Sequence, residues 1–126
     1  MEMRTVKLLF RLFSGVDIET ETEYVPIVEM AVTEVEKMLK EGADSSDIRL
    51  CYLSAALANY RYRQIICGQD RTEVTYAGKM SRAEHDISLE YAEKMFRDYV
   101  HLCEDIIVSS DFVFMAFGTE GGCGNA

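Results

Sequence analysis

The sequence predicts an all-α fold: a small helical bundle of three main helices plus a short N-terminal helix. The first observation behind this prediction is a stretch at residues 47–67 whose middle is almost entirely apolar. The second is that apolar side chains in other segments recur at the spacing of a helix. The third is a composition with 48% hydrophobic residues and 1 proline, which is typical of a globular chain.

Residues 47–67 are the predicted central helix, against which the others pack. No residue from 50 to 58 is charged, and the one polar residue there is Ser54. The polar residues of the wider stretch scatter around the helix axis, which is the pattern of a helix surrounded by protein. Arginines interrupt the stretch, which excludes a membrane span of about 20 predominantly apolar residues.

Two helices are expected before the central one. Residues 5–13 place four apolar side chains on one face of a short helix, although a strand is the alternative for this β-compatible run. The acidic residues 17–23 are interpreted as a loop or a helix entry. The next helix runs over residues 26–41, with Pro26 in its first turn and Gly42 as its stop. A cap within residues 44–47 then begins the central helix, and the short link makes the two helices antiparallel.

The second half of the chain holds one further long helix. Residues 69–80 contain a short β-like alternation, and we expect a projecting loop or small hairpin there. Ser81 and Glu84 fit a capping box at the start of a helix that ends near Ile107. We therefore expect one helical domain over residues 1–117.

An aromatic run at residues 111–117 closes the predicted domain. Its phenylalanines complete the base of the core or, alternatively, form a terminal peptide that adds to a partner. Residues 118–126 are rich in glycine and have nothing to pack, so they form a flexible tail.

Charge and cysteine content limit the classes of function. The net charge is −9, with −6 on residues 17–41 and −4 on residues 81–105. No cluster of basic residues is visible for specific nucleic-acid recognition, and no segment suits a membrane. The opening residues lack a signal-peptide pattern, so we expect a protein that is not secreted. The 4 cysteines are widely spaced without a CxxC pair, and we expect free thiols.

Motifs that could carry chemistry are incomplete. Asp98 and His101 form a single D-x-x-H pair, whereas helical di-metal sites use such a pair on each of two helices. Glu90 and Glu93 form the E-x-x-E pair of helical Mg²⁺-dependent nucleotide hydrolases, but the second acidic pair is missing. Cys103 lies two residues after His101, about 200° away around a helix. We therefore expect no enzymatic activity, and no catalytic, cofactor-binding or metal-binding residues.

The segment Asn59-Tyr-Arg-Tyr-Arg63 interleaves aromatic and basic side chains. On a helix Tyr60 and Tyr62 point about 160° apart, as do the two arginines, so they cannot form one platform for nucleic acid. We expect the tyrosines to anchor neighbouring helices. Arg61 and Arg63 should pair with the acidic outer helices, within the chain or across a subunit contact.

A family resemblance rests on several of these segments. The run DIRLCYLSAALANYRYR at residues 47–63, YAGK at 76–79, LEYAEK at 89–94 and DFVF at 111–114 resembles the small head-tail connector proteins of tailed bacteriophages and prophages. The similarity spans roughly residues 25–117 and includes no catalytic signature. The resemblance implies a helical adaptor that assembles into a ring between the portal and the tail and lets DNA pass.

The resemblance also implies partners and a location. The partners are other copies of the chain together with portal and tail proteins, and the location is the bacterial cytoplasm during assembly and then the virion. An acidic channel wall would let DNA slide by repulsion. The alternatives are a helical Mg²⁺-dependent nucleotide hydrolase and a generic helical module that binds one protein. The candidate contact residues are Tyr60, Arg61, Tyr62, Arg63, Arg71, Val74, Tyr76, Lys79, Phe112 and Phe114.

Overall fold

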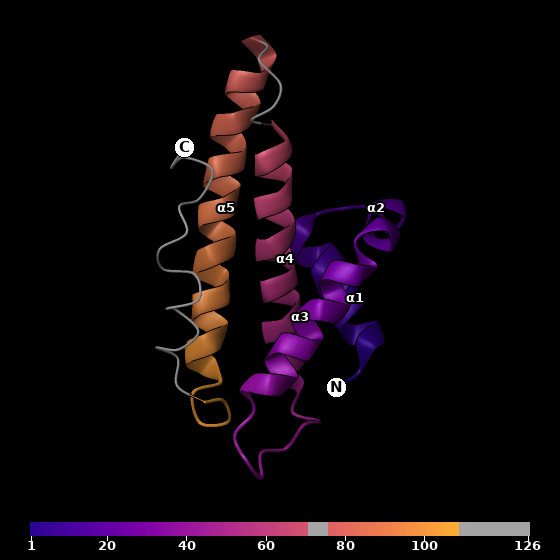
Figure 1. Ribbon diagram of the computed structural model, residues 1–126, viewed down its shortest axis with the longest axis vertical. Coiled ribbons are helices and arrows are strands. Elements are labelled where there is room, and N and C mark those ends of the chain that lie inside the picture. The colour runs from indigo at the N-terminus through magenta and orange to yellow at the C-terminus, as the bar shows by residue number, and fades with distance from the viewer. Residues whose placement is uncertain (71–75, 109–126) are drawn as a thin grey trace.

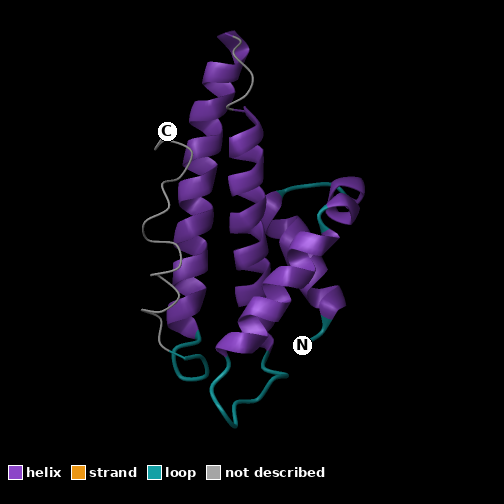
Figure 2. Ribbon diagram, in the orientation of Figure 1, coloured by secondary structure: helices purple, strands orange, loops and turns teal. Residues whose placement is uncertain are grey.

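The computed structural model describes the backbone of residues 1–70 and 76–108, and the side chains of residues 1–69 and 87–108. Within these ranges the chain forms five helices and no strand (Figures 1 and 2). The all-α prediction is confirmed. Two long helices stand side by side. The first and third of the three N-terminal helices pack against part of the earlier long helix, and the second packs against the other two N-terminal helices (Figure 1).

The N-terminal region forms two helices. Helix α1, Met3–Ser14, confirms the predicted short helix over the alternative strand, and it ends at Gly15 in the left-handed conformation (φ 75°). Helix α2, Ile18–Glu23, lies in the acidic segment that was expected to be a loop or a helix entry. Asp17 begins it, because its side chain accepts a hydrogen bond from the Thr20 backbone N–H at 2.8 Å.

Helix α3, Val25–Met38, ends earlier than the sequence predicted. Leu39 leaves the helix because it is extended and forms an antiparallel bridge with Ile107. The Val108 N–H donates to the Met38 carbonyl at 2.7 Å in the same contact. The prediction that Gly42 stops this helix was therefore wrong, since a contact with a distant part of the chain ends it first.

Helix α4, Ile48–Asp70, is the predicted central helix. It packs against α1, α3 and α5, and every side chain from 50 to 58 except Tyr52 is buried. Asp47 provides the expected cap by accepting the Arg49 backbone N–H at 2.9 Å. None of the helices in the described part of the chain has the length and apolar character to cross a membrane.

Helix α5, Tyr76–Leu102, begins before and ends before the predicted positions. Helix α4 reaches Asp70, and α5 begins at Tyr76. The expected loop or hairpin over residues 69–80 was therefore wrong for residues 69–70 and 76–80, which are helical. Residues 71–75 lie outside the described residues. A short two-stranded pairing is marginal by itself, whereas extending two packed helices adds a hydrogen bond per residue. Ser81 consequently lies inside α5 and does not cap it.

Aromatic side chains join the helices around one core. Phe13 of α1, Tyr52 of α4 and Tyr99 of α5 form a three-ring cluster with centroid distances of 5.7 to 6.4 Å. The buried apolar residues form a single cluster that draws on α1, α3, α4 and α5.

The cysteines differ from the prediction at one position. Cys51 and Cys103 are free and buried, as expected. Cys67 is disulfide-bonded, so the expectation of a free thiol there was wrong. Widely spaced cysteines carry no signal of pairing in sequence, because the fold alone decides which ones meet.

Candidate functional site

The second half of α4 directs its two tyrosines to different neighbours. Tyr60 stacks on Phe96 of α5, with ring centroids 6.4 Å apart and planes within 4°. Tyr62 meets Phe10 of α1 edge to face at 5.8 Å. The prediction that they anchor neighbouring helices is confirmed. They are 4% and 9% exposed, so they offer little surface to a partner.

Arg61 connects α4 to the acidic helix α3. Its Nη2 atom lies 3.1 Å from Oε1 of Glu34 and 3.3 Å from Oε2. Both side chains keep 35% exposure. The predicted pairing of Arg61 with an acidic outer helix is therefore confirmed within the chain.

Arg63 has a main-chain partner at the end of α1. Its Nη2 atom donates to the backbone carbonyl of Ser14 at 2.6 Å, and its guanidinium lies 5.3 Å from the centre of the Tyr62 ring. Ser14 is the last residue of α1, where carbonyls lack partners within the helix and carry partial negative charge. Within the chain, Arg63 therefore contacts a main-chain acceptor at the end of α1 and not the acidic side chain that one alternative predicted; its pairing across a subunit contact stays a prediction.

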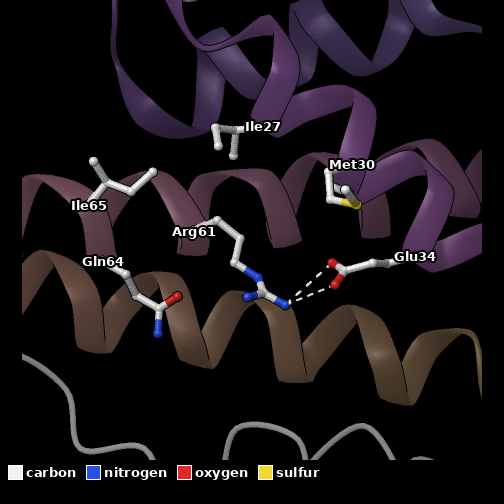
Figure 3. A pocket seen from close by; sticks show the side chains of 7 residues that line it. Ile27, Met30, Glu34, Arg61, Gln64 and Ile65 are labelled. Carbon is white, nitrogen blue, oxygen red and sulfur yellow. Dashed lines mark hydrogen bonds and ion pairs between the residues drawn. The ribbon is translucent and has the colours of Figure 1, made fainter.

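A groove lies between α3 and α4 beside the Arg61–Glu34 pair (Figure 3). Its volume is about 340 Å³. Arg61 and Glu34 point toward one another across it, and Ile27 and Met30 lie on its α3 side (Figure 3). Met30 is 59% exposed, so it adds apolar surface at the α3 side of the groove. The lining residues are Ile27, Met30, Ala31, Glu34, Arg61, Gln64 and Ile65.

The composition of this groove suits contact with another protein. Its walls are mainly aliphatic, and its charged groups are a neutralised pair at the side. An apolar centre with polar groups at its margin is the usual arrangement of protein interfaces. We name this set of residues the α3–α4 groove. The sequence predicted Arg61 as a candidate contact residue, but it did not predict Met30 or Ile27. Their exposure depends on how α3 packs against α4, which no local pattern shows.

Side chains considered for metal binding do not come together in the described residues. Glu93 pairs with Arg97 on the helix surface at 2.6 Å. His101 is exposed, and its Nδ1 atom lies 2.7 Å from Glu104. No group of three or more His, Cys, Asp or Glu side chains with metal-binding geometry occurs in the part of the chain that the structure describes.

Cys103 is not poised to act as a nucleophile. Its side chain is buried, and its sulfur is 3.8 Å from the Arg49 carbonyl oxygen. Burial raises the pKa of the Cys103 thiol to about 11, so it remains protonated at neutral pH. Only the thiolate is strongly nucleophilic.

The remaining predicted contact residues either lie on α5, away from the α3–α4 groove, or belong to the part of the chain that the structure does not describe. Tyr76 and Lys79 belong to the first turns of α5, not to a loop. Arg71, Val74, Phe112 and Phe114 lie outside the described residues.

Comparison with known proteins returned no relative. No protein-family model matches the chain, no curated protein matches it, and no solved structure matches it.

Proposed function

We propose that this protein is a structural subunit of a phage or prophage head-tail connector, and that copies of it assemble into a ring through which DNA passes. The proposal starts from the resemblance of residues 25–117 to that family. The arrangement of the helices adds a physical reason for ring contacts.

The observation that carries the proposal is that the α3–α4 groove and the projecting end of the α4–α5 pair lie at different places on the molecule. The groove has exposed Met30 at its edge. The far end of the α4–α5 pair extends beyond α1, α2 and α3 (Figure 1). A ring of identical subunits needs two different patches that fit each other, because its contacts are heterologous. We assign the groove to the neighbouring copy's α4–α5 end.

The acidic helices suit the wall of a DNA channel. Glu19 and Glu23 of α2 and Glu29 and Glu36 of α3 are exposed. Their charge would repel phosphates and prevent DNA from sticking as it passes. We propose that α2 and α3 face the channel, and that portal and tail proteins contact the two ends of the ring.

The proposed location is the bacterial cytoplasm during assembly and the virion afterwards. Disulfides persist in oxidising surroundings and are rare in a reducing cytosol. The disulfide at Cys67 is compatible with a particle that leaves the cell.

Particle mass and negative-stain images at rising protein concentration test the proposal. We expect rings with a central opening, and we expect the change Met30→Glu to abolish them because it buries a charge in the contact. Leu12→Glu is the matched control, since Leu12 is 67% exposed on α1 away from the α3–α4 groove. Monomers at every concentration and salt, or equal loss of rings in both variants, would contradict the proposal.

A further inference from the structure

Helix α5 carries a second apolar surface, separate from the α3–α4 groove. Ile87, Tyr91 and Leu102 are 55%, 69% and 52% exposed, and Met95 and Tyr99 lie half-buried between them. Steps of three and four residues place all of them on one face of the helix. We name this surface the α5 stripe; it comprises Ile87, Tyr91, Met95, Tyr99 and Leu102. A shallow hollow lies along it from Tyr91 to Leu102.

The described chain ends beside one end of the α5 stripe. Ile107 is held by its bridge to Leu39, and the Val108 N–H donates to the Met38 carbonyl. These bonds fix Val108 near the C-terminal end of α5, six residues after Leu102. Residues 109–126 follow, and their first half contains the apolar run Phe-Val-Phe-Met-Ala-Phe at 112–117.

The lengths of the α5 stripe and of the apolar run agree. From Ile87 to Leu102 the helix rises about 22 Å, at about 1.5 Å per residue. Seven extended residues, 111–117, span about 23 Å. A run that leaves Val108 and turns back toward Ile87 therefore covers the stripe from end to end.

The disulfide at Cys67 gives an independent reason for this path. Tyr60 of α4 stacks on Phe96 of α5, and the two helices run in opposite directions (Figure 1). Seven residues further along α4 is Cys67, and seven residues back along α5 is Leu89, so Cys67 is level with the Ile87 end of the stripe. Cys51 and Cys103 are free, which leaves Cys123 as the remaining cysteine of the sequence.

We propose that residues 109–126 of the same chain fold back along α5, with the aromatic run on the α5 stripe and Cys123 paired with Cys67. The occupant of the stripe is thus the chain's own C-terminal segment, not a second copy. This goes beyond the connector proposal, because it assigns a surface and a covalent tie that ring formation does not require.

Peptide mapping without reductant tests the covalent part of the proposal. We expect a Cys67–Cys123 linked peptide from the monomer, with Cys51 and Cys103 unlinked. A link between two chains, or a link from Cys67 to another cysteine, would overturn the proposal.

Hydrogen exchange of the amides in residues 109–117 of the full chain tests the packing. We expect protection in the wild type and about tenfold faster exchange in Tyr91→Lys. Leu12→Lys is the matched control, since Leu12 and Tyr91 are 67% and 69% exposed. Unprotected amides in the wild type, or equal exchange in Tyr91→Lys and the wild type, would overturn it. Met30→Glu should leave this exchange unchanged, which separates a failure here from a failure of the ring proposal.

Discussion

The apolar stretch of α4 and the arginines on either side of it use opposite kinds of interaction. Residues 50–58 are buried among α1, α3 and α5, and they hold the fold together by apolar contact. Arg49 before this stretch, and Arg61 and Arg63 after it, reach out of the helix to charged or carbonyl partners, and α4 continues to Asp70 beyond them. Residues 50–58 bring the helices together by apolar contact. The arginines on either side of this stretch hold neighbouring helices in place, and the α3–α4 groove lies beside one of them, Arg61.

The largest effect should come from the middle of the helix. Leu57 is 0% exposed, and Leu57→Ala should lower the free energy of unfolding by about 2–5 kcal/mol, because the change leaves a cavity in the core. Leu12→Ala, at a side chain 67% exposed, should change it by at most about 0.5 kcal/mol. Urea denaturation measures both values. Equal losses in the two variants would contradict the division between the apolar stretch and the arginines around it.

The sequence predicted the apolar stretch of α4 better than the contacts of the arginines around it. Burial of residues 50–58 was predictable because a helix without polar side chains needs protein on all sides. The directions of Tyr60 and Tyr62 followed from helix geometry alone. These are local properties, and the structure confirms them.

The features that could not be predicted depend on contacts between distant residues. Helix α3 ends at Met38 because Leu39 meets Ile107, and nothing near Leu39 in the sequence indicates this. Helix α2 has only six residues and no apolar stripe, so the Asp17 cap was its one available signal. In the candidate site, the pairing of Arg61 followed from the charge of α3, whereas the Arg63 partner is a backbone carbonyl without a side-chain signature.

A smaller effect should come from Arg61, beside the α3–α4 groove. Arg61→Ala should lower the free energy of unfolding by about 0.2–1 kcal/mol, because water screens a half-exposed ion pair. Arg97→Ala is the control, since Arg97 also forms an exposed pair, with Glu93 on α5. We expect similar small losses in urea for both variants, with ring formation weakened only by Arg61→Ala. A loss from Arg61→Ala as large as that from Leu57→Ala would show that Arg61 also belongs to the core.

The third effect should appear at the start of α4, as a loss of stability that depends on pH. Arg49 donates to the side chains of Asp47 and Asp105 and to the Leu102 carbonyl, joining the start of α4 to the end of α5. Hydrogen bonds from the Arg49 side chain lower the pKa of both carboxyl groups below their ordinary value of 3.8. The folded protein therefore favours their charged forms more than the unfolded chain does.

The sign of the pH dependence follows from these lowered pKa values. The stabilisation is fully present above the unfolded pKa of about 4 and is lost as the pH falls through the lower folded values. Urea midpoints of the wild type and of Arg49→Gln between pH 6 and pH 2 measure it. We expect Arg49→Gln to be the less stable protein at pH 6 and the difference to shrink in acid. Asp17 and Asp44, whose pKa values are lowered by local hydrogen bonds, titrate alike in both proteins and cancel in the comparison. A difference that stays constant down to pH 2 would mean that Arg49 acts through its bond to the Leu102 carbonyl and not through the two carboxylates.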